Sequence, residues 1–221
     1  MKLAHLWLSE PIKFDEGTVN VLVIESPHLY RNFLMDLVLQ ESGIVGDFVL
    51  SQKNEIIEFH KKAVVISDIF RLDFQSRKIS AKLNNFICNI FDMDEDCRNL
   101  FGNLNELGYK IQDELPFETE FNHFENLEDI VKLFDFKISD NHIDIAERLF
   151  EYLKIQKDFF GKELCVIVGL KGCLEQDELE MFYKRLEYEK INVLLLEHHH
   201  CDYSLTCERI VIIDNDLCEI K

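Results

Sequence analysis

The chain has 221 residues, of which 47% are hydrophobic and 30% are charged, and its formal net charge at pH 7 is −18. This hydrophobic content excludes a disordered chain, and the length suffices for one domain or for one domain with a large insertion. The negative charge counts against simple nucleic-acid binding and favours a basic partner or a metal ion.

The cellular location is predicted from the apolar segments and the cysteines. No run of about 18 apolar residues occurs, so no membrane span is expected. Residues 1–8 are apolar, but they are too short for a signal peptide and are followed by Glu10, Asp15 and Glu16, so a first β-strand is predicted there. The seven cysteines include no C-x-x-C pair, which indicates a reduced, cytoplasmic location.

The first third of the chain reads as strands with one helix between them. Residues 18–24 are rich in β-branched side chains and predict a buried strand. Ser26 and Pro27 then form a helix start, with Ser26 as N-cap and Pro27 at the first helical position. Residues 47–50 and 63–66 predict two further strands.

The middle of the chain changes to helical periodicity. Apolar residues recur at helical spacing over residues 79–115 without a proline, which predicts one long helix or two in tandem. Further helices are predicted over residues 127–134 and 142–160.

Strands return near the carboxyl terminus. Residues 163–168 and 191–196 predict strands separated by an amphipathic helix over 176–189, and this order implies a parallel sheet. Residues 209–213 predict a last strand. The predicted fold is therefore α/β: residues 1–78 and 139–221 form a head domain with a mostly parallel sheet, and residues 79–138 form an inserted, extended helical leg.

Two segments that follow predicted strands were compared with a nucleotide-binding phosphate loop. Such a loop has the form G-x-x-x-x-G-K-[ST] after a strand. The segment after the first buried strand, residues 25–28, contains no glycine. Residues 168–173 contain two glycines and Lys171, but the spacing and the final hydroxyl are wrong. Ordinary turns explain both segments better.

The charges are segregated along the chain. Residues 53–82 contain seven Lys or Arg and four acidic residues, whereas residues 83–129 contain two and twelve. Basic stripes of this kind contact phosphates without reading sequence, although scattered surface charges are the alternative. The candidate phosphate contacts are Lys53, Lys61, Lys62, Lys78, Lys82, Lys132 and Lys137.

The acidic residues between Ile111 and Lys132, here called the acidic segment, predict a metal site. Glu118 and Glu120 lie near a proline-containing turn, and Glu125 and Glu128 follow at helical spacing. Carboxylates in such number suit calcium, which takes six to eight oxygen ligands. The alternative is a solvated acidic face. The run His198 to Cys201 also contains metal-ligand residues, but adjacent histidines point in different directions, so a surface loop explains it better.

Several segments resemble a known family. Residues 8–12 (LSEPI) with 17–23 (GTVNVLV), residues 65–76 (VISDIFRLDFQS) and residues 193–197 (VLLLE) resemble, in this order, segments of the Csn-two family, the type II-A CRISPR accessory proteins of spacer acquisition. The agreement in length and order covers essentially the whole chain.

The resemblance implies a specific fold and function. Members have an α/β head that is similar to phosphate-loop ATPases but lacks a nucleotide site, and a helical leg. Four copies form a ring that calcium stabilises, and the ring accepts ends of double-stranded DNA without sequence specificity. The implied partners are the CRISPR integrase pair and the effector nuclease, and no catalytic activity is implied.

The resemblance also implies roles for particular residues. The acidic run lies where the family's leg binds calcium, which makes Glu118, Glu120, Glu125, Glu128 and Asp129 the ligand candidates. Lys132 matches a family lysine and is the first DNA-contact candidate.

Two other functions stay open on the residues alone. A metal-dependent nuclease or phosphatase would use the same carboxylates, but such enzymes usually place acids at strand ends, and these acids lie in the helical insertion. A protein-interaction module with an acidic leg is the second alternative.

Overall fold

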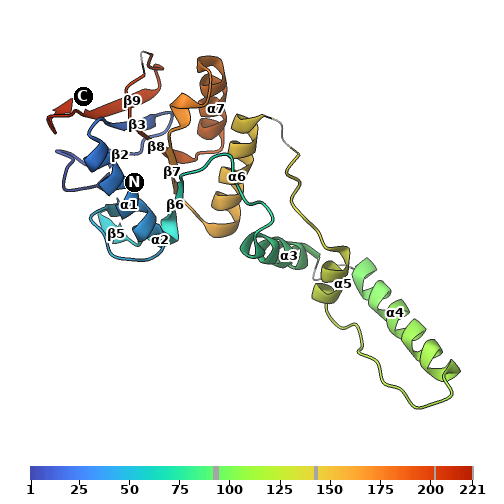
Figure 1. Ribbon diagram of the computed structural model, residues 1–221. Helices are drawn as coiled ribbons and strands as arrows, with labels where there is room; N and C mark the ends of the chain where they lie inside the picture. The colour runs from blue at the N-terminus through green and yellow to red at the C-terminus, as the bar shows by residue number, and fades with distance from the viewer. Residues whose placement is uncertain (92–94, 142–143, 202, 221) are drawn as a thin grey trace. The chain divides into compact units, whose positions relative to one another are not determined.

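The computed structural model describes residues 1–91, 95–141, 144–201 and 203–220, and the chain forms two compact units (Figure 1). Unit 1 consists of Met1–Leu72 and Asn141–Lys221, and unit 2 consists of Asp73–Asp140. The sequence placed the corresponding boundaries after residues 78 and 138. In both divisions, the helical segment is inserted into a domain built from the two ends of the chain.

Unit 1 is organised around a six-stranded sheet of order β10-β9-β3-β8-β7-β6. Five of its strands are parallel, and β10 pairs with β9 in the antiparallel direction. The strands are β3 (Val19–Ile24), β6 (Ala63–Ile66), β7 (Leu164–Val168), β8 (Asn192–Glu197), β9 (Glu208–Ile213) and β10 (Glu219–Ile220). The predicted α/β class with a mostly parallel sheet is confirmed.

Helices cover both faces of this sheet, as Figure 1 shows for α1 (Pro27–Glu41) on one side and α6 (Ile145–Phe160) and α7 (Gln176–Tyr188) on the other. Every residue of β3 is buried, which is typical of a parallel strand between two helical layers. Alternate residues of β3 face opposite sides. Leu22 and Ile24 join a core that includes Phe33 and Leu37 of α1.

A second, antiparallel sheet of order β2-β1-β4-β5 packs beside α1 and shares its core. Its strands are β1 (Lys2–Ala4), β2 (Ile12–Lys13), β4 (Val49–Gln52) and β5 (Glu55–Ile57). The sequence predicted strands at the positions of β1 and β4 but not that they form a sheet of their own. The short helix α2 (Phe59–Lys62) then leads into β6.

Unit 2 is helical. Its helices are α3 (Arg77–Phe91), α4 (Glu95–Glu114) and α5 (Leu127–Phe134). The periodic segment 79–115 therefore forms two helices, and α5 has the predicted bounds. The helix predicted over 142–160 is α6 of unit 1, and position 142 lies outside the described residues. In the described part of the chain, no helix is long and apolar enough to cross a membrane.

A buried ion pair fixes the loop before β9 in unit 1. Lys171, in the 3-10 turn η1 (Leu170–Gly172), donates to the Glu208 carboxylate at 2.8 Å, and the two side chains are 3% and 0% exposed. The same carboxylate accepts from the Tyr183 hydroxyl at 2.8 Å and from the Leu205 amide at 3.1 Å. Lys171 therefore serves the fold and is not available to a phosphate.

Removal of this lysine should be strongly destabilising. Lys171→Met leaves the Glu208 carboxylate buried without its cation, and such a loss costs about 3–5 kcal/mol. Urea unfolding should show a much lower midpoint. The control is Lys61→Met, which removes an exposed ion pair with Glu58 and should leave the midpoint nearly unchanged. Equal midpoints for the two variants would contradict the proposed role of the buried pair.

Candidate nucleic-acid interface

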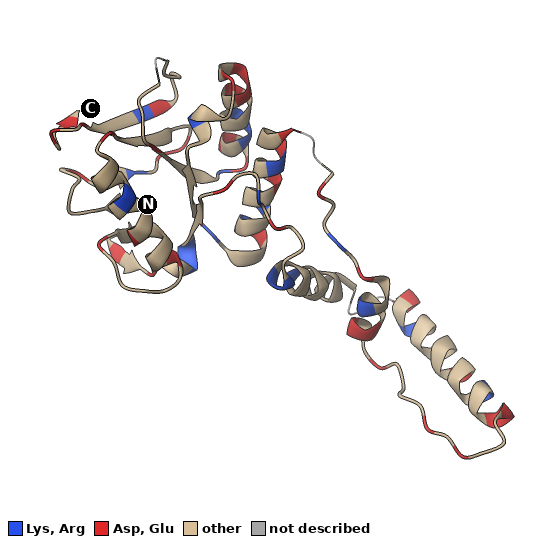
Figure 2. Cartoon of the chain, in the orientation of Figure 1, with Lys and Arg blue, Asp and Glu red and all other residues tan. Residues whose placement is uncertain are grey.

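The first turns of α3 carry a concentration of positive charge. Arg77, Lys78 and Lys82 are exposed, and the helix contains no Asp or Glu (Figure 2). Lys78 and Lys82 are one turn apart and lie on the same face. Cations near a helix amino terminus oppose the helix dipole, so these residues do not serve the stability of α3. They form an open basic surface in a chain whose net charge is −18.

Helix α5 packs against α3 through Ile130 and Val131, which are buried. Its amino terminus is capped by the Asn126 side chain, which accepts a hydrogen bond from the Asp129 amide at 3.3 Å. On its exposed face, the Lys132 ammonium lies 3.6 Å from the Glu128 carboxylate and 3.7 Å from that of Asp129. The first DNA-contact candidate is thus paired with two of the calcium-ligand candidates.

The other predicted lysines fall into different settings. Lys137 is exposed in unit 2 and pairs with Asp135 at 2.5 Å. Lys53 lies in the β4–β5 turn with a positive φ of 50°. Lys61 pairs with Glu58 at 2.7 Å. Lys62 pairs with Glu163 at 2.5 Å, next to the β6–β7 pairing, and so has a structural partner. The predicted basic stretch is therefore divided between the two units.

The acidic segment runs back along α4 and is held to it by specific contacts. The Asn105 side chain both donates to the Phe124 carbonyl and accepts from the Phe124 amide, at 3.0 and 2.8 Å. The Gln112 side chain donates to the Thr119 carbonyl, and the Phe121 ring lies against Gly108. The Phe121 ring faces the helix, whereas Glu118 and Glu120 are exposed to solvent.

The predicted calcium ligands do not converge within one chain. Glu118, Glu120 and Glu125 lie on the segment after α4, and Glu128 and Asp129 lie in the first turn of α5. Among the described residues, only His5, Asp36 and Asp47 bring three acidic, histidine or cysteine ligand atoms within 4.8 Å of one another. The calcium site stays a prediction.

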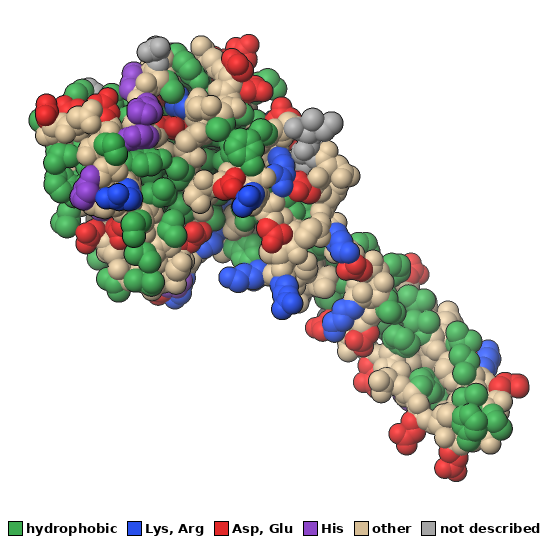
Figure 3. All heavy atoms as spheres, viewed as in Figure 1, with side chains coloured by type: hydrophobic (Ala, Val, Ile, Leu, Met, Phe, Trp, Pro, Cys, Tyr) green, Lys and Arg blue, Asp and Glu red, His purple; other side chains and the backbone are tan. Residues whose placement is uncertain are grey.

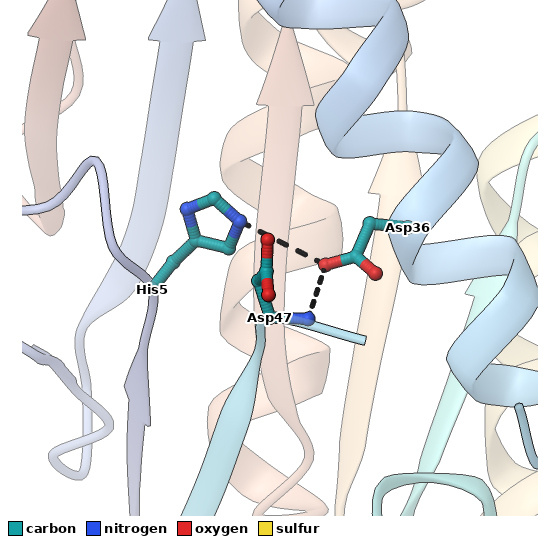
Figure 4. A group of neighbouring side chains, drawn as sticks. All are labelled: His5, Asp36 and Asp47. Carbon is teal, nitrogen blue, oxygen red and sulfur yellow. Dashed lines mark hydrogen bonds and ion pairs between the residues drawn. The ribbon is translucent and has the colours of Figure 1, made fainter. Parts of the chain in front are cut away.

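The cluster of His5, Asp36 and Asp47 lies in unit 1 (Figure 4). The Nε2 atom of His5 lies 3.7 Å from the Asp36 carboxylate, which accepts from the Asp47 amide at 2.9 Å. The Nδ1 atom of His5 accepts from the Trp7 amide at 3.3 Å. A neutral imidazole that accepts at Nδ1 carries its proton on Nε2, so the ring donates toward Asp36 and offers no lone pair to a metal there.

Polar contacts of this cluster therefore connect the end of β1, helix α1 and the loop before β4. The His5 ring packs between Phe33 and Phe48, with ring centroids 4.0 and 4.4 Å apart. Burial lowers the pKa of His5, and the nearby carboxylates of Asp36 and Asp47 oppose this effect in part. The neutral ring with its proton on Nε2 is the form that fits the hydrogen bond from the Trp7 amide and the contact with Asp36.

The position of a phosphate loop, after β3, is occupied by a direct strand-to-helix connection. Only Glu25 and Ser26 separate β3 from α1. The Glu25 amide donates to the Ile213 carbonyl at 2.9 Å, and Pro27 has no amide hydrogen. This connection therefore lacks the row of free amides that cradles phosphates.

The family model of the CRISPR-associated protein Cas_Csn2 matches residues 40–217, which is most of the chain and includes both units. The chain belongs to this family. The role of this Cas_Csn2 chain is therefore CRISPR-associated, in agreement with the resemblance found in the sequence.

The other comparisons add little. No curated protein matched the chain. Among solved structures, it is similar to an ABC transporter ATP-binding protein from Pyrococcus furiosus, with a TM-score of 0.40, 10% identity, and coverage of 95% of this chain and 97% of that one. It is also similar to an ATP-binding cassette of an ABC transporter in its ADP conformation, with a TM-score of 0.40, 10% identity, and coverage of 87% and 74%. Neither likeness bears on its function.

Two features of the interface were not predicted. Arg77 was counted in the basic stretch but not chosen as a contact, although it neighbours Lys78 at the start of α3. The bonds between Asn105 and Phe124 link residues 19 positions apart, and no local pattern in the sequence signals them.

The close packing at Gly108 can be tested by adding one methyl group. A Cβ at this position would lie less than 3.0 Å from atoms of the Phe121 ring, so Gly108→Ala should displace the acidic segment from α4. Hydrogen exchange at the Phe124 amide should become faster. In the control Gly102→Ala, the new Cβ meets nothing within 4 Å, and the helix should gain about 1 kcal/mol. Unchanged exchange in Gly108→Ala would contradict this packing.

The lowered pKa of His5 predicts a pH dependence of stability. Below about pH 6.5 the unfolded chain takes up a proton at this histidine that the folded chain does not, so folding weakens as the pH falls. The free energy of unfolding, measured from pH 7 to 5.5, should fall less steeply in His5→Gln than in the wild type. Identical slopes in the wild type and His5→Gln would rule out this effect.

Proposed function

We propose that this protein is a non-enzymatic accessory factor of spacer acquisition. It assembles as a homotetrameric ring, is stabilised by calcium, and binds the ends of double-stranded DNA without sequence specificity. Its partners are the CRISPR integrase pair and the effector nuclease. The proposal deepens the CRISPR-associated role given by the family.

One observation carries the DNA-binding part. In a chain with 42 acidic and 24 basic residues, the first turns of α3 present Arg77, Lys78 and Lys82 without an acidic residue on the helix. Locally concentrated cations are needed because the net charge would otherwise repel DNA. Side chains on such a surface contact phosphates, which hold a duplex without reading its bases.

The apolar face of α4 supports assembly. No residue of this 20-residue helix is buried, and Leu100, Leu107 and Ile111 are 41%, 53% and 55% exposed (Figure 3). Together with Leu104 they recur at spacings of four and three residues, the pattern of a seam between paired helices. Within the described part of unit 2, this seam is only partly covered, and we propose that further copies of the chain cover the rest.

In this proposal, calcium binding releases Lys132 from its ion pairs. Glu128 and Asp129 hold Lys132 in exposed ion pairs, which contribute little to stability and exchange readily. A calcium ion on these carboxylates, with ligands from the acidic segment, displaces the ammonium and leaves Lys132 for a phosphate. Calcium thereby couples metal binding to DNA binding.

The carboxylates do not support the nuclease or phosphatase alternative. Metal-dependent phosphoryl chemistry holds its ions between converging acids. The candidate acids are spread over the segment after α4 and the start of α5 in unit 2, and none of them belongs to a strand or a strand end of the sheets of unit 1. The two loops that follow β3 and β7 are also occupied by structural contacts.

Neutralising the basic residues in the first turns of α3 should weaken DNA binding. The triple variant Arg77→Gln, Lys78→Gln, Lys82→Gln should bind duplexes of any sequence at least about tenfold more weakly, with a salt dependence reduced by about one ion per lost phosphate contact. The control changes three lysines of unit 1, Lys2, Lys13 and Lys190, to Gln and should bind nearly as the wild type does. Equal losses in both variants would show that only net charge matters.

The exchange of Lys132 between carboxylates and DNA can be measured directly. DNA affinity of the wild type should rise about tenfold in calcium relative to chelator, whereas Glu128→Gln with Asp129→Asn should show no calcium response and tighter binding in chelator. The matched control is Glu106→Gln, which breaks a similar exposed ion pair with Lys110 on α4 and should retain the response. A wild type that binds equally in calcium and chelator would contradict the coupling.

A further inference from the structure

A cavity of about 650 Å³ opens in unit 1 at the amino ends of β3, β8 and β9, beside α7. It lies at the opposite end of the sheet from the edge where open α/β sheets usually bind ligands. Its volume falls in the range of small-molecule sites. Val19, Leu186 and Ile191 provide apolar wall, and Thr18 and Thr206 provide hydroxyl groups.

The cavity lining contains more negative than positive charge after the ion pairs of its residues are counted. Asp15 pairs with Arg209 at 3.1 Å, and Glu16 pairs with Lys190 at 3.2 Å. In contrast, Glu180 and Glu187 have no Lys or Arg nitrogen within 4.0 Å among the described residues. Lys184 lines the same cavity one helical turn from each of them, and its side chain also borders a separate depression beside α6.

These two carboxylates are arranged on one face of α7. They are seven residues apart, which corresponds to two helical turns and about 10.5 Å along the axis. Glu187 lies against Gly17, where an added Cβ would be 2.9 Å from its Oε1 atom. Burial raises the pKa of the Cys207 thiol, and Glu208, Glu187 and Glu180 raise it further. The negative charges of Glu180 and Glu187 therefore both act on Cys207, which lines the cavity.

We propose that this cavity binds an aliphatic diamine or polyamine. Two ammonium groups separated by a chain of methylene groups would pair with Glu180 and Glu187, and the chain would pass Lys184 and lie on the apolar part of the cavity lining. Ammonium–carboxylate hydrogen bonds are among the stronger polar contacts, and a half-enclosed cavity screens them less than open solvent does. The same charges exclude nucleotides and other anions.

Isothermal titration calorimetry of the full chain with 1,8-diaminooctane and spermidine tests the proposal, at about 0.15 M salt so that exposed charges are screened. Both amines should bind one site per chain. The shorter 1,4-diaminobutane, which cannot reach both carboxylates, and octylamine, which has one charge, should bind about tenfold more weakly. Magnesium chloride at equal charge should not displace the bound diamine.

Matched variants separate this site from general attraction to an acidic protein. Glu180→Gln and Glu187→Gln should each weaken diamine binding about tenfold. The control Glu55→Gln with Glu114→Gln removes two exposed carboxylates elsewhere and should leave binding unchanged. The proposal is overturned if the wild type binds no diamine at millimolar concentration, if magnesium displaces it, or if the control weakens binding as much as the cavity variants do.

Discussion

The described part of unit 2 fully buries few apolar side chains, and much of the proposed function depends on this feature. Its buried residues, among those described, are Phe74, Ile79, Ile130 and Val131. A unit of this size normally needs a larger core to fold. In the proposed assembly, the apolar seam of α4 lies between copies of the chain. Such an assembly would bring together several copies of the basic first turns of α3 and several acidic segments.

The two units also differ in how their Lys and Arg side chains are paired. In unit 1, cations are used within the fold: Lys171 is buried with Glu208, and Lys62 is paired with Glu163 beside the sheet. In unit 2, the cations of α3 have no acidic neighbour on their helix, and Lys132 is held only by exposed pairs. In the proposed function, a strongly negative protein binds a polyanion because the position of its cations matters more than their number.

Much of the fold could be predicted from the sequence because the relevant signals are local. The buried strands β3, β7 and β8 are continuous apolar runs, and α5 has an amphipathic pattern and an Asn126 cap. The antiparallel sheet of β1, β2, β4 and β5 was missed because strands of two to four residues are too short to show periodicity.

The candidate site was harder to predict because it depends on distant partners. The residue types of the acidic and basic segments are visible in the sequence, but the pairing of Lys171 with Glu208 and the docking of Phe121 on Gly108 are set by tertiary packing. Likewise, the sequence indicated five carboxylates as calcium ligands, whereas a single chain leaves them spread along one segment and one helix. Their convergence, if they bind one ion, depends on assembly or on the ion itself.

The most direct test of the ring is light scattering after size-exclusion chromatography, with the protein in calcium and one plasmid added either as closed circles or after linearisation. The proposal predicts a mass of four chains and co-elution with the linear DNA only, because a closed ring must enter a duplex from an end. A single-chain mass, or equal binding to closed circles, would contradict it.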